Sequence, residues 1–381
     1  MQQEFPRLKV MTVVGTRPEI IRLSRVISKF DQVFDHVLVH TGQNYDYELN
    51  QIFFEQLGIP RPKHFLEAAR STPAETMGAV IQSADKVIAM EKPDAFLVLG
   101  DTNSCLAALP AKRRKIPVFH MEAGNRCFDF RVPEEINRRL VDHLSDVNLP
   151  YTTLARDYLI SEGLPSDLVI KTGSPMFEVL SFYEKFINES DVLNRLNLSH
   201  RSYFLVSLHR EENVDDPENF SSVCKALNHL CQKYNQRVIF SAHPRTQNII
   251  TKQQVSLNKL VEIHKPFGFF DFVNLQLNAR VVLSDSGTIT EESSILNFPA
   301  VNVRNSHERP EGFEEGAVVF SGTEAESILR CVDLVESQSR SEKRQFRIVD
   351  DYTSPNVSEK MVRIVASYTP YVNWKVWRKR S

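Results

Sequence analysis

The sequence lacks the short motifs that mark several common enzyme classes. It contains neither G-x-G-x-x-G nor G-x-x-x-x-G-K-[ST], so a tightly bound NAD or FAD and P-loop phosphotransfer are unsupported. It has no G-x-S-x-G motif, which argues against a serine hydrolase. No H-E-x-x-H and no cluster of cysteine and histidine offers a metal site. The absences predict chemistry without a metal or a redox cofactor.

Cysteine pairs, long apolar runs and an excess of one charge are also missing. The five cysteines are scattered and form no C-x-x-C pair, which fits a reducing cytoplasm. Apolar runs such as 95–99 are too short to span a bilayer, and the N-terminal residues lack the apolar core of a signal peptide. The net charge of −2, from 46 Lys and Arg against 48 Asp and Glu, gives no broad attraction to nucleic acid. We therefore expect a cytoplasmic protein with no nucleic-acid partner and no membrane insertion.

Apolar runs alternate with helical patterns along the 381 residues, which predicts an α/β protein with parallel sheets. Two Rossmann-like halves of similar size are expected, with bounds 1–175 and 176–357 and a C-terminal helix at 358–381. A helix at 134–145 carries Ile136, Leu140 and Leu144 on one apolar face. The principal predicted strands are 8–14, 36–40, 94–99, 117–121, 147–150, 168–172, 203–208, 237–241, 260–263, 281–283, 299–303 and 317–320.

The stretch 279–294, ARVVLSDSGTITEESS, has the pattern of an anion-binding turn. A short apolar strand is followed by small residues and then by a helix, so backbone N–H groups at Ser286, Gly287 and Thr288 would face a phosphate. Glu292, about one and a half turns later, would bind ribose hydroxyls. The alternative is an ordinary capped helix, because Ser and Asp are good caps and acids favour first turns.

Polar residues follow many of the predicted strands, where ligands bind in open α/β sheets. The first half offers Arg17, Gln43, Asp101 and Glu122, and the second offers His209, His243, Ser286 and Arg309. If the halves face each other across a cleft, these residues line it. Single residues have simpler explanations: Asp101 would cap a helix, Arg126 would neutralise Glu122, and Glu134 begins a helix. As a set, carboxylates and a histidine beside a nucleotide diphosphate suit proton abstraction and return.

The motifs resemble, in order, those of the non-hydrolysing UDP-N-acetylglucosamine 2-epimerase family. They are GTRPE at 15–19, GDT at 100–102, HMEAG at 120–124, PEEINR at 133–138, HR at 209–210, DSG at 285–287 and ERPE at 308–311. The resemblance implies a glycosyltransferase-B-like fold, a UDP-amino-sugar substrate, no cofactor and a homodimer. It also implies elimination of UDP across C1–C2 and re-addition, with a proton delivered to the opposite face of C2.

Site residues follow from the resemblance position by position. The implied catalytic residues are Asp101, Glu122, Glu134 and His209, and base and acid are not assigned among the three carboxylates. The implied substrate- and UDP-binding residues are Arg17, Arg22, Gln43, Arg138, Arg210, His243, Ser286, Gly287, Thr288, Glu292 and Arg309.

Within the family, the chain is most similar to the bacterial UDP-N-acetyl-L-fucosamine synthases, which act on UDP-2-acetamido-2,6-dideoxy-L-talose for surface polysaccharide synthesis. Segments RPEIIR at 17–22, TGQNYDYE at 41–48, NRCFD at 125–129 and TGSPM at 172–176 carry this similarity. Glucosamine-type enzymes usually have Lys, His and Gly where Arg22, Asn44 and Thr288 stand. The alternatives are a UDP-N-acetylglucosamine 2-epimerase that makes UDP-N-acetylmannosamine, a glycosyltransferase of the same fold, and a non-catalytic nucleotide-sugar sensor.

Overall fold

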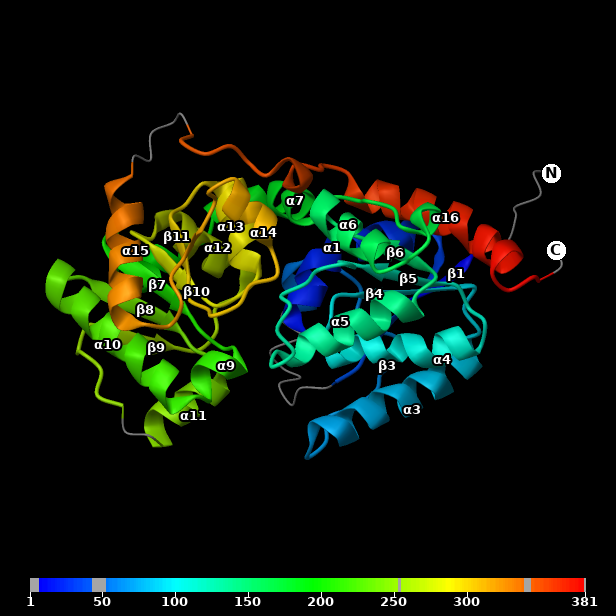
Figure 1. Cartoon of the computed structure of the whole chain (residues 1–381), viewed down its shortest axis with the longest axis horizontal. Helices are drawn as coiled ribbons and strands as arrows, with labels where there is room; N and C mark the ends of the chain where they lie inside the picture. Colours follow the sequence, from blue (N-terminus) through cyan, green and yellow to red (C-terminus); the bar gives the residue numbers. More distant parts are fainter. Residues whose placement is uncertain (1–6, 43–52, 253–254, 339–343, 380–381) are drawn as a thin grey trace. The chain divides into compact units, whose positions relative to one another are not determined.

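The computed structural model describes residues 7–42, 53–252, 255–338 and 344–379. The chain divides into two compact units (Figure 1). The first unit consists of Met1–Val179 and Thr353–Ser381, and the second unit of Leu180–Tyr352. The boundary between them falls inside helix α7, Met176–Asn188.

The first unit is built on a six-stranded parallel sheet with the order β3-β2-β1-β4-β5-β6. This is the strand order of dinucleotide-binding Rossmann folds. Its strands are β1 Lys9–Val14, β2 Asp35–His40, β3 His64–Phe65, β4 Ala95–Leu99, β5 Val118–Met121 and β6 Val147–Leu149. The helices are α1 Arg17–Val33, α3 Pro73–Glu91, α4 Ala108–Arg113, α5 Pro133–Leu144, α6 Thr153–Ser161 and α16 Val357–Lys375, with 3-10 turns η1 Asn103–Ala107 and η2 Ser166–Leu168.

The second unit repeats this topology. Its parallel sheet has the order β12-β11-β10-β7-β8-β9, which is the same arrangement when the strands are renumbered from β7. Its strands are β7 Tyr203–Ser207, β8 Arg237–Ser241, β9 Val261–His264, β10 Val282–Ser284, β11 Ala300–Asn302 and β12 Val319–Phe320. The helices are α8 Val192–Arg195, α9 Glu211–Val214, α10 Pro217–Tyr234, α11 Pro244–Lys252, α12 Phe269–Asn278, α13 Thr288–Leu296, α14 Pro310–Glu314 and α15 Ala325–Ser337, and 3-10 turn η3 is Asp350–Tyr352.

The central strands are apolar on both faces because helices cover both sides of each sheet. Strand β7 shows this alternation: Phe204 and Val206 join one buried cluster with residues of α10 and α15. Tyr203 and Leu205 join the opposite cluster with residues of α12 and α13. The predicted α/β class with parallel sheets is confirmed.

Three local features differ from the sequence-based expectations. Strand β3 was not predicted, because two residues leave no periodic signal. Residues 168–172 form no strand: Leu168 ends a 3-10 turn, and the segment makes a single bridge, from Val169 to Asn148. Two residues of the apolar face predicted for α5 lie outside the core, because Ile136 and Leu140 are 53% and 49% exposed, whereas Leu144 packs against a buried cluster.

No helix in the described ranges combines the length and the apolar character needed to cross a membrane.

Candidate functional site

The predicted site residues follow adjacent strands in each unit. In the first sheet β1, β4 and β5 are neighbours, and Arg17, Asp101 and Glu122 come directly after them. In the second sheet β10, β7 and β8 are neighbours, and Ser286, His209 and His243 follow these strands. Gln43 lies outside the described residues.

Asp101 is bound by Arg138 from α5. Asp101 Oδ2 accepts hydrogen bonds from Arg138 Nε at 3.0 Å and from Nη2 at 2.5 Å. Asn137, the preceding residue of α5, donates from Nδ2 to the Asp101 carbonyl at 3.0 Å. The carboxylate keeps 24% side-chain exposure, so it is held in one orientation and remains accessible.

Glu122 pairs with Arg22 of α1, and its Oε1 accepts from Asn125 Nδ2 at 3.2 Å. The sequence-based expectation that Arg126 neutralises Glu122 is wrong, because Arg126 binds Asp142 and Glu162 instead. Glu122 has φ +65°, a left-handed conformation that non-glycine residues rarely adopt. Strained backbone of this kind clusters at functional sites.

The two acids that begin α5 have different environments. Glu134 is half-buried, and Glu135 is fully buried. Glu135 accepts from Arg138 Nη1 at 2.9 Å, Arg139 Nε at 2.8 Å and the Cys127 backbone N–H at 3.0 Å. Glu135 therefore holds the arginine that holds Asp101. Its role was not predicted, because sequence alone does not distinguish adjacent acids in a first turn.

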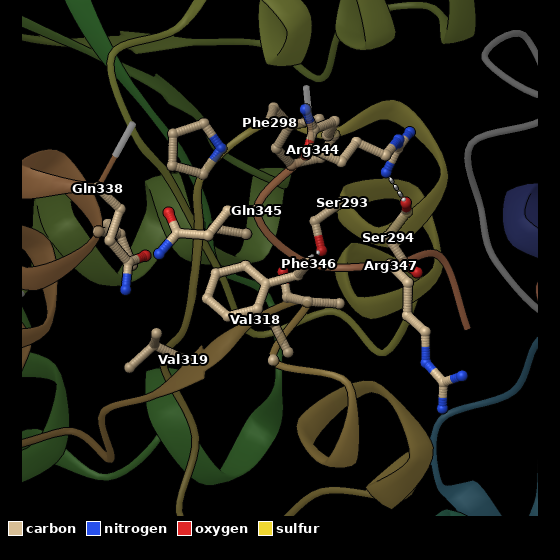
Figure 2. Close-up of a pocket in the computed structure, with 16 residues that line it drawn as sticks. Ser293, Ser294, Phe298, Val318, Val319, Gln338, Arg344, Gln345, Phe346 and Arg347 are labelled. Carbon is tan, nitrogen blue, oxygen red and sulfur yellow. Dashed lines mark hydrogen bonds between the residues drawn. The ribbon is translucent and has the colours of Figure 1, made fainter. Parts of the chain in front are cut away.

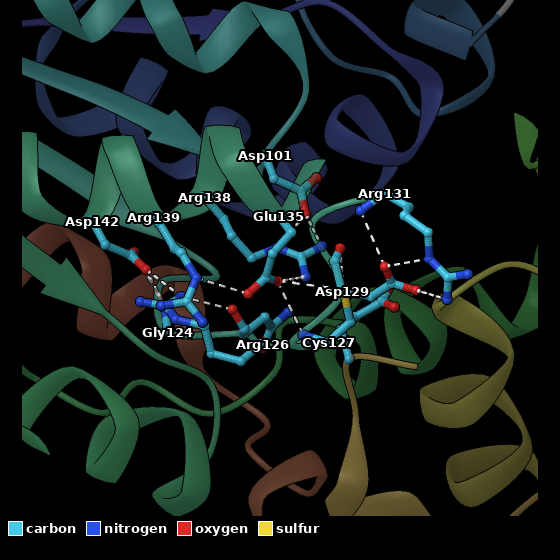
Figure 3. Close-up of polar contacts among 12 residues, drawn as sticks. Asp101, Gly124, Arg126, Cys127, Asp129, Arg131, Glu135, Arg138, Arg139 and Asp142 are labelled. Atoms are coloured by element: carbon cyan, nitrogen blue, oxygen red, sulfur yellow. Dashed lines mark hydrogen bonds and ion pairs between the residues drawn. The ribbon is translucent and has the colours of Figure 1, made fainter. Parts of the chain in front are cut away.

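A chain of ion pairs extends from Glu135 through Arg139 and returns to the start of the Asp101 loop. Figure 3 shows its links between Glu135 and Arg139 and between Arg126 and Asp142. Arg139 pairs with Glu162, Glu162 with Arg126, and Arg126 with Asp142. Asp142 then lies 2.9 Å from His120 Nδ1.

His120 closes this chain of charges. Its Nε2 contacts the Gly100 carbonyl at 2.8 Å, next to Asp101. The carbonyl and the carboxylate are both acceptors, and both favour the protonated form of the ring. Burial lowers the pKa of His120, but contact with the charge of Asp142 more than offsets it, and the pKa lies above its usual value.

Glu19 of α1 is a buried carboxyl that sequence reasoning did not select. Its Oε2 accepts from the backbone N–H groups of Gly15 and Thr16, at 2.5 and 3.3 Å. Its Oε1 accepts from the hydroxyls of Thr102 and Ser104, the latter at 2.8 Å. Burial raises the pKa of the Glu19 carboxyl to about 7, although these four donors lower it.

In the second unit, side chains organise the turn before α13. Ser286 N–H donates to Ser284 Oγ at 3.1 Å, and Thr288 N–H donates to Ser286 Oγ at 3.3 Å. The hydroxyls of Ser286 and Thr288 are 3.0 Å apart and share a hydrogen bond. Thr288, the departure from the family pattern, therefore fixes the Ser286 rotamer.

Gly287 is required by the close approach of Glu308. A Cβ atom at Gly287 would lie 2.5 Å from Glu308 Oε1. Glu308 is itself held by Arg304 Nη1 at 2.6 Å and by Arg210 Nη2 at 3.4 Å. A side chain at 287 would therefore displace an organised carboxylate.

Gly287→Ala is expected to weaken UDP binding by about 10-fold or more, the scale of 1.4 kcal/mol lost from aligned contacts, because Glu308 and the turn must move apart. Isothermal titration with UDP measures this effect. Gly78→Ala is the matched control, because Gly78 lies within α3 with no atom within 4 Å of its added Cβ. The control is expected to leave affinity unchanged and to stabilise the helix by roughly 0.5–1 kcal/mol. Equal affinities for the Gly287 variant and the wild type would contradict the steric argument.

Asp285 is a further buried carboxyl that the candidate set did not include. It is completely buried, and its carboxylate accepts from the backbone N–H groups of His209 (3.0 Å) and Arg210 (2.9 Å) and from Asn213 Nδ2 (3.2 Å). The His209 ring, 44% exposed, lies with Nδ1 3.3 Å from Asp285 Oδ1. One carboxylate thus orients the whole His209–Arg210 turn.

The remaining candidate site residues of the second unit differ in how deeply they are buried. Glu292 is buried and accepts from Gln276 Nε2 at 2.6 Å. Arg309 is buried and pairs with Glu291 at 3.1 Å. His243 is half-buried after β8, and its Nδ1 accepts from the Arg245 backbone at 3.4 Å.

A pocket in the second unit lies at the other end of α13 (Figure 2). Ser293, Ser294 and Phe346 line it, and Arg344 Nη1 donates to the Ser294 carbonyl at 2.8 Å. None of the predicted site residues lines this pocket. Within the described ranges, no group of three or more His, Cys, Asp and Glu side chains is arranged to hold a metal ion.

Known proteins resemble the chain over most of its length. The profile of the family described as UDP-N-acetylglucosamine 2-epimerase matches residues 28–366. The structure of UDP-N-acetylglucosamine 2-epimerase from Rickettsia bellii is 50% identical, with a TM-score of 0.90 over 98% of this chain and 100% of that chain. The Methanocaldococcus jannaschii UDP-GlcNAc 2-epimerase, solved with UDP-GlcNAc and UDP, is 34% identical, with a TM-score of 0.88 over 94% and 99%. A Pseudomonas aeruginosa UDP-2,3-diacetamido-2,3-dideoxy-D-glucuronate 2-epimerase is 36% identical over 84% of this chain and 90% of its own.

Proposed function

Because the chain belongs to the UDP-N-acetylglucosamine 2-epimerase family, we propose that it inverts C2 of a UDP-2-acetamido sugar by eliminating and re-adding UDP. The protein is an isomerase that acts on UDP-sugars. The observation that carries the proposed route is the pair of arginine-bound carboxylates, Asp101 and Glu122, after adjacent strands.

The reaction needs no electron acceptor. A carboxylate removes the proton from C2, the C–H electron pair forms the C1=C2 double bond, and the C1–O bond breaks with its pair on UDP. In the return step a UDP oxygen attacks C1, and an acid protonates C2 from the opposite face. Positioned general acids and bases contribute typically 10²–10⁴-fold to such proton transfers.

Residue roles follow from position and chemistry. Asp101, Glu122 and Glu134 are the candidates for base and acid, and the order among them stays open. Arg17, Arg22 and Arg138 supply positive charge in the first unit. His209, Arg210, Arg309 and the backbone at Gly287 stabilise the departing diphosphate, and Glu292 binds the ribose; the N–H groups of Ser286 and Thr288 donate within the turn instead.

We further propose UDP-2-acetamido-2,6-dideoxy-L-talose as the substrate and UDP-N-acetyl-L-fucosamine as the product, for surface polysaccharide synthesis. The support is the set of subgroup segments, which includes Arg22, the partner of Glu122. Thr288, which bonds Ser286, is a departure from the glucosamine-type pattern. The alternative is UDP-N-acetylglucosamine as substrate and UDP-N-acetylmannosamine as product, and it is favoured by the Rickettsia bellii and Methanocaldococcus jannaschii relatives, which are named UDP-N-acetylglucosamine 2-epimerases.

Both UDP-sugars, offered separately in deuterated water and followed by NMR, test these proposals together. The expected result is turnover of the 6-deoxy-talose substrate with deuterium at C2 of the product. Turnover of UDP-N-acetylglucosamine alone would overturn the substrate assignment and keep the mechanism. Product without deuterium would exclude the mechanism. Transfer to an acceptor, or UDP binding without turnover, would instead indicate the glycosyltransferase or the sensor.

We also propose a homodimer in the cytoplasm. An exposed apolar patch on the first unit supports the dimer: Ile136 and Leu140 of α5 lie beside Arg139, which stacks on Phe128 and Phe130. Exposed apolar patches mark interaction sites in soluble proteins. Light scattering should give twice the chain mass of 43.8 kDa, and Ile136→Glu should halve it. A monomeric wild type would refute the dimer.

A further inference from the structure

The buried carboxyl of Glu19 contacts two loops that follow adjacent strands. Strand β1 pairs with β4 in parallel, so the turn at Gly15–Thr16 and the loop that begins at Gly100 lie at the same edge of the sheet. Glu19 is 2% exposed, and each of its oxygens serves one loop: Oε2 accepts from the first turn, and Oε1 accepts from Thr102 and Ser104.

These two loops carry charged residues of the candidate site. The first turn leads directly into Arg17, the first residue of α1. The second loop carries Asp101, the neighbour of Thr102. Arg138 of α5 binds the Asp101 carboxylate. Glu19 binds the hydroxyl of Thr102, the residue that follows Asp101, and so holds the next part of the loop.

The chain contains a second helix start of the same design that lacks this link. Helix α3 also begins with a Thr-x-x-Glu capping box, and Glu75 Oε2 accepts from the Thr72 N–H at 3.1 Å. Glu75 is exposed, and among the described residues its carboxylate bonds only its own helix start. An exposed glutamate that bonds only its own helix start is therefore enough to cap such a helix. The additional bonds of Glu19 to Thr102 and Ser104 are not needed for capping. Burial of a carboxyl is costly, so the bonds to Thr102 and Ser104 call for another explanation.

We propose that Glu19 is a positioning residue that joins the Arg17 turn to the Asp101 loop and sets the orientation of Asp101 for proton transfer. The inference rests on the proposed function, because it takes Asp101 to act in the reaction. Glu19 acts through Thr102, with no contact to substrate required.

Glu19→Gln is expected to lower kcat by about 10- to 100-fold, the scale of a small misplacement of a reacting group, with KM changed less than about threefold. The amide oxygen can still accept from the Gly15 and Thr16 N–H groups, but the NH₂ cannot accept from the Thr102 and Ser104 hydroxyls. These hydroxyls must reorient to accept from it, and the carboxylate charge that they bind is lost. Glu75→Gln is the matched control and should retain wild-type kcat and KM. An unchanged kcat in the Glu19 variant would overturn the proposal.

Thr102 provides the sharper test because its substitution leaves the bonds of Glu19 to Gly15 and Thr16 in place. Thr102→Val should lower kcat as Glu19→Gln does, and Thr102→Ser, which keeps the hydroxyl, should restore it. Because the Thr102 hydroxyl also accepts from the Ser104 N–H at 3.3 Å, the rescue supports the link only if Glu19→Gln, which leaves that cap in place, lowers kcat to a similar extent. If the serine variant is as impaired as the valine variant, the hydroxyl bond to Glu19 does not position Asp101.

Hydrogen exchange separates this inference from the proposed function. Amide exchange followed by mass spectrometry should accelerate in Glu19→Gln over both segments 15–22 and 100–107, and in Glu75→Gln over 72–78 alone. Acceleration confined to 15–22 would refute the link between the loops. A wild type that turns over no UDP-2-acetamido sugar would refute the proposed function, while the exchange result would still decide whether Glu19 joins the loops.

Discussion

Asp101→Asn and Glu122→Gln are each expected to lower kcat by about 100-fold or more, the range of general acid–base catalysis. The amides preserve shape but cannot take the C2 proton. Each substitution also leaves an arginine, Arg138 or Arg22, facing a neutral partner. Steady-state rates with the accepted UDP-sugar measure the effect, and thermal melting confirms that the variants fold.

The chain offers a close control for the first of these substitutions. Asp85 binds Arg114 through the guanidinium Nε and Nη2 at 2.6 and 2.9 Å, as Asp101 binds Arg138 through the same two atoms. The side chains of Arg114 and Asp85 are 40% and 46% exposed. Asp85→Asn should keep wild-type kcat, because exposed ion pairs contribute little. Near-normal turnover in both Asp101→Asn and Glu122→Gln would exclude these carboxylates as the base or acid.

Asp285→Ala is expected to destabilise the second unit by about 3 kcal/mol, because it leaves two backbone N–H groups and the Asn213 amide without their buried acceptor. For a unit of this size the loss corresponds to a Tm decrease of roughly 6–12 °C. The His209–Arg210 turn loses its support in the same step, so UDP affinity should fall as well. Differential scanning calorimetry and UDP titration measure the two effects.

Asp216→Ala separates the effect of burial from the loss of a carboxylate. Asp216 also accepts from two backbone N–H groups, those of Glu218 and Asn219, at the exposed start of α10. Its removal should cost about 1 kcal/mol, the usual value of an N-cap, and leave UDP affinity unchanged. A Tm decrease no larger for Asp285→Ala than for Asp216→Ala would show that the buried acceptor contributes nothing extra.

The positions of the site residues at strand ends were predictable because parallel sheets bring those ends to one edge. Arg17, Asp101 and Glu122 needed only the strand pattern and a family resemblance to be selected. The prediction placed strand 281–283 before the turn at Ser286–Thr288, and the structure has β10 at Val282–Ser284.

The partners of these residues were not predictable, because they lie far away in sequence. Arg22 meets Glu122 across 100 residues, and Arg138 meets Asp101 across 37. Proximity in sequence favoured Arg126 as the partner of Glu122, but the left-handed backbone at Glu122 turns its side chain toward α1.

For helix α5, the hydrophobic pattern predicted the wrong face as the buried one. Its apolar residues suggested the buried face, yet Glu135, Arg138 and Asp142 are buried instead. Ion pairs and hydrogen bonds satisfy each of them, so a polar network replaces the apolar stripe that periodicity assumes. The most chemically informative helix of the first unit was therefore the one that its hydrophobic pattern described least well.

Helix α16 has a practical consequence for protein engineering. It belongs to the first unit, where it packs on α1 and donates from the Ser358 N–H to Glu178 Oε2 at 2.9 Å. The second unit is therefore inserted within the sequence of the first, and the chain passes between the two units twice. Deleting α16 would strip the support from the helix that carries Arg17, Glu19 and Arg22. Affinity tags and truncations near the last helix thus perturb residues more than 300 positions earlier in the chain.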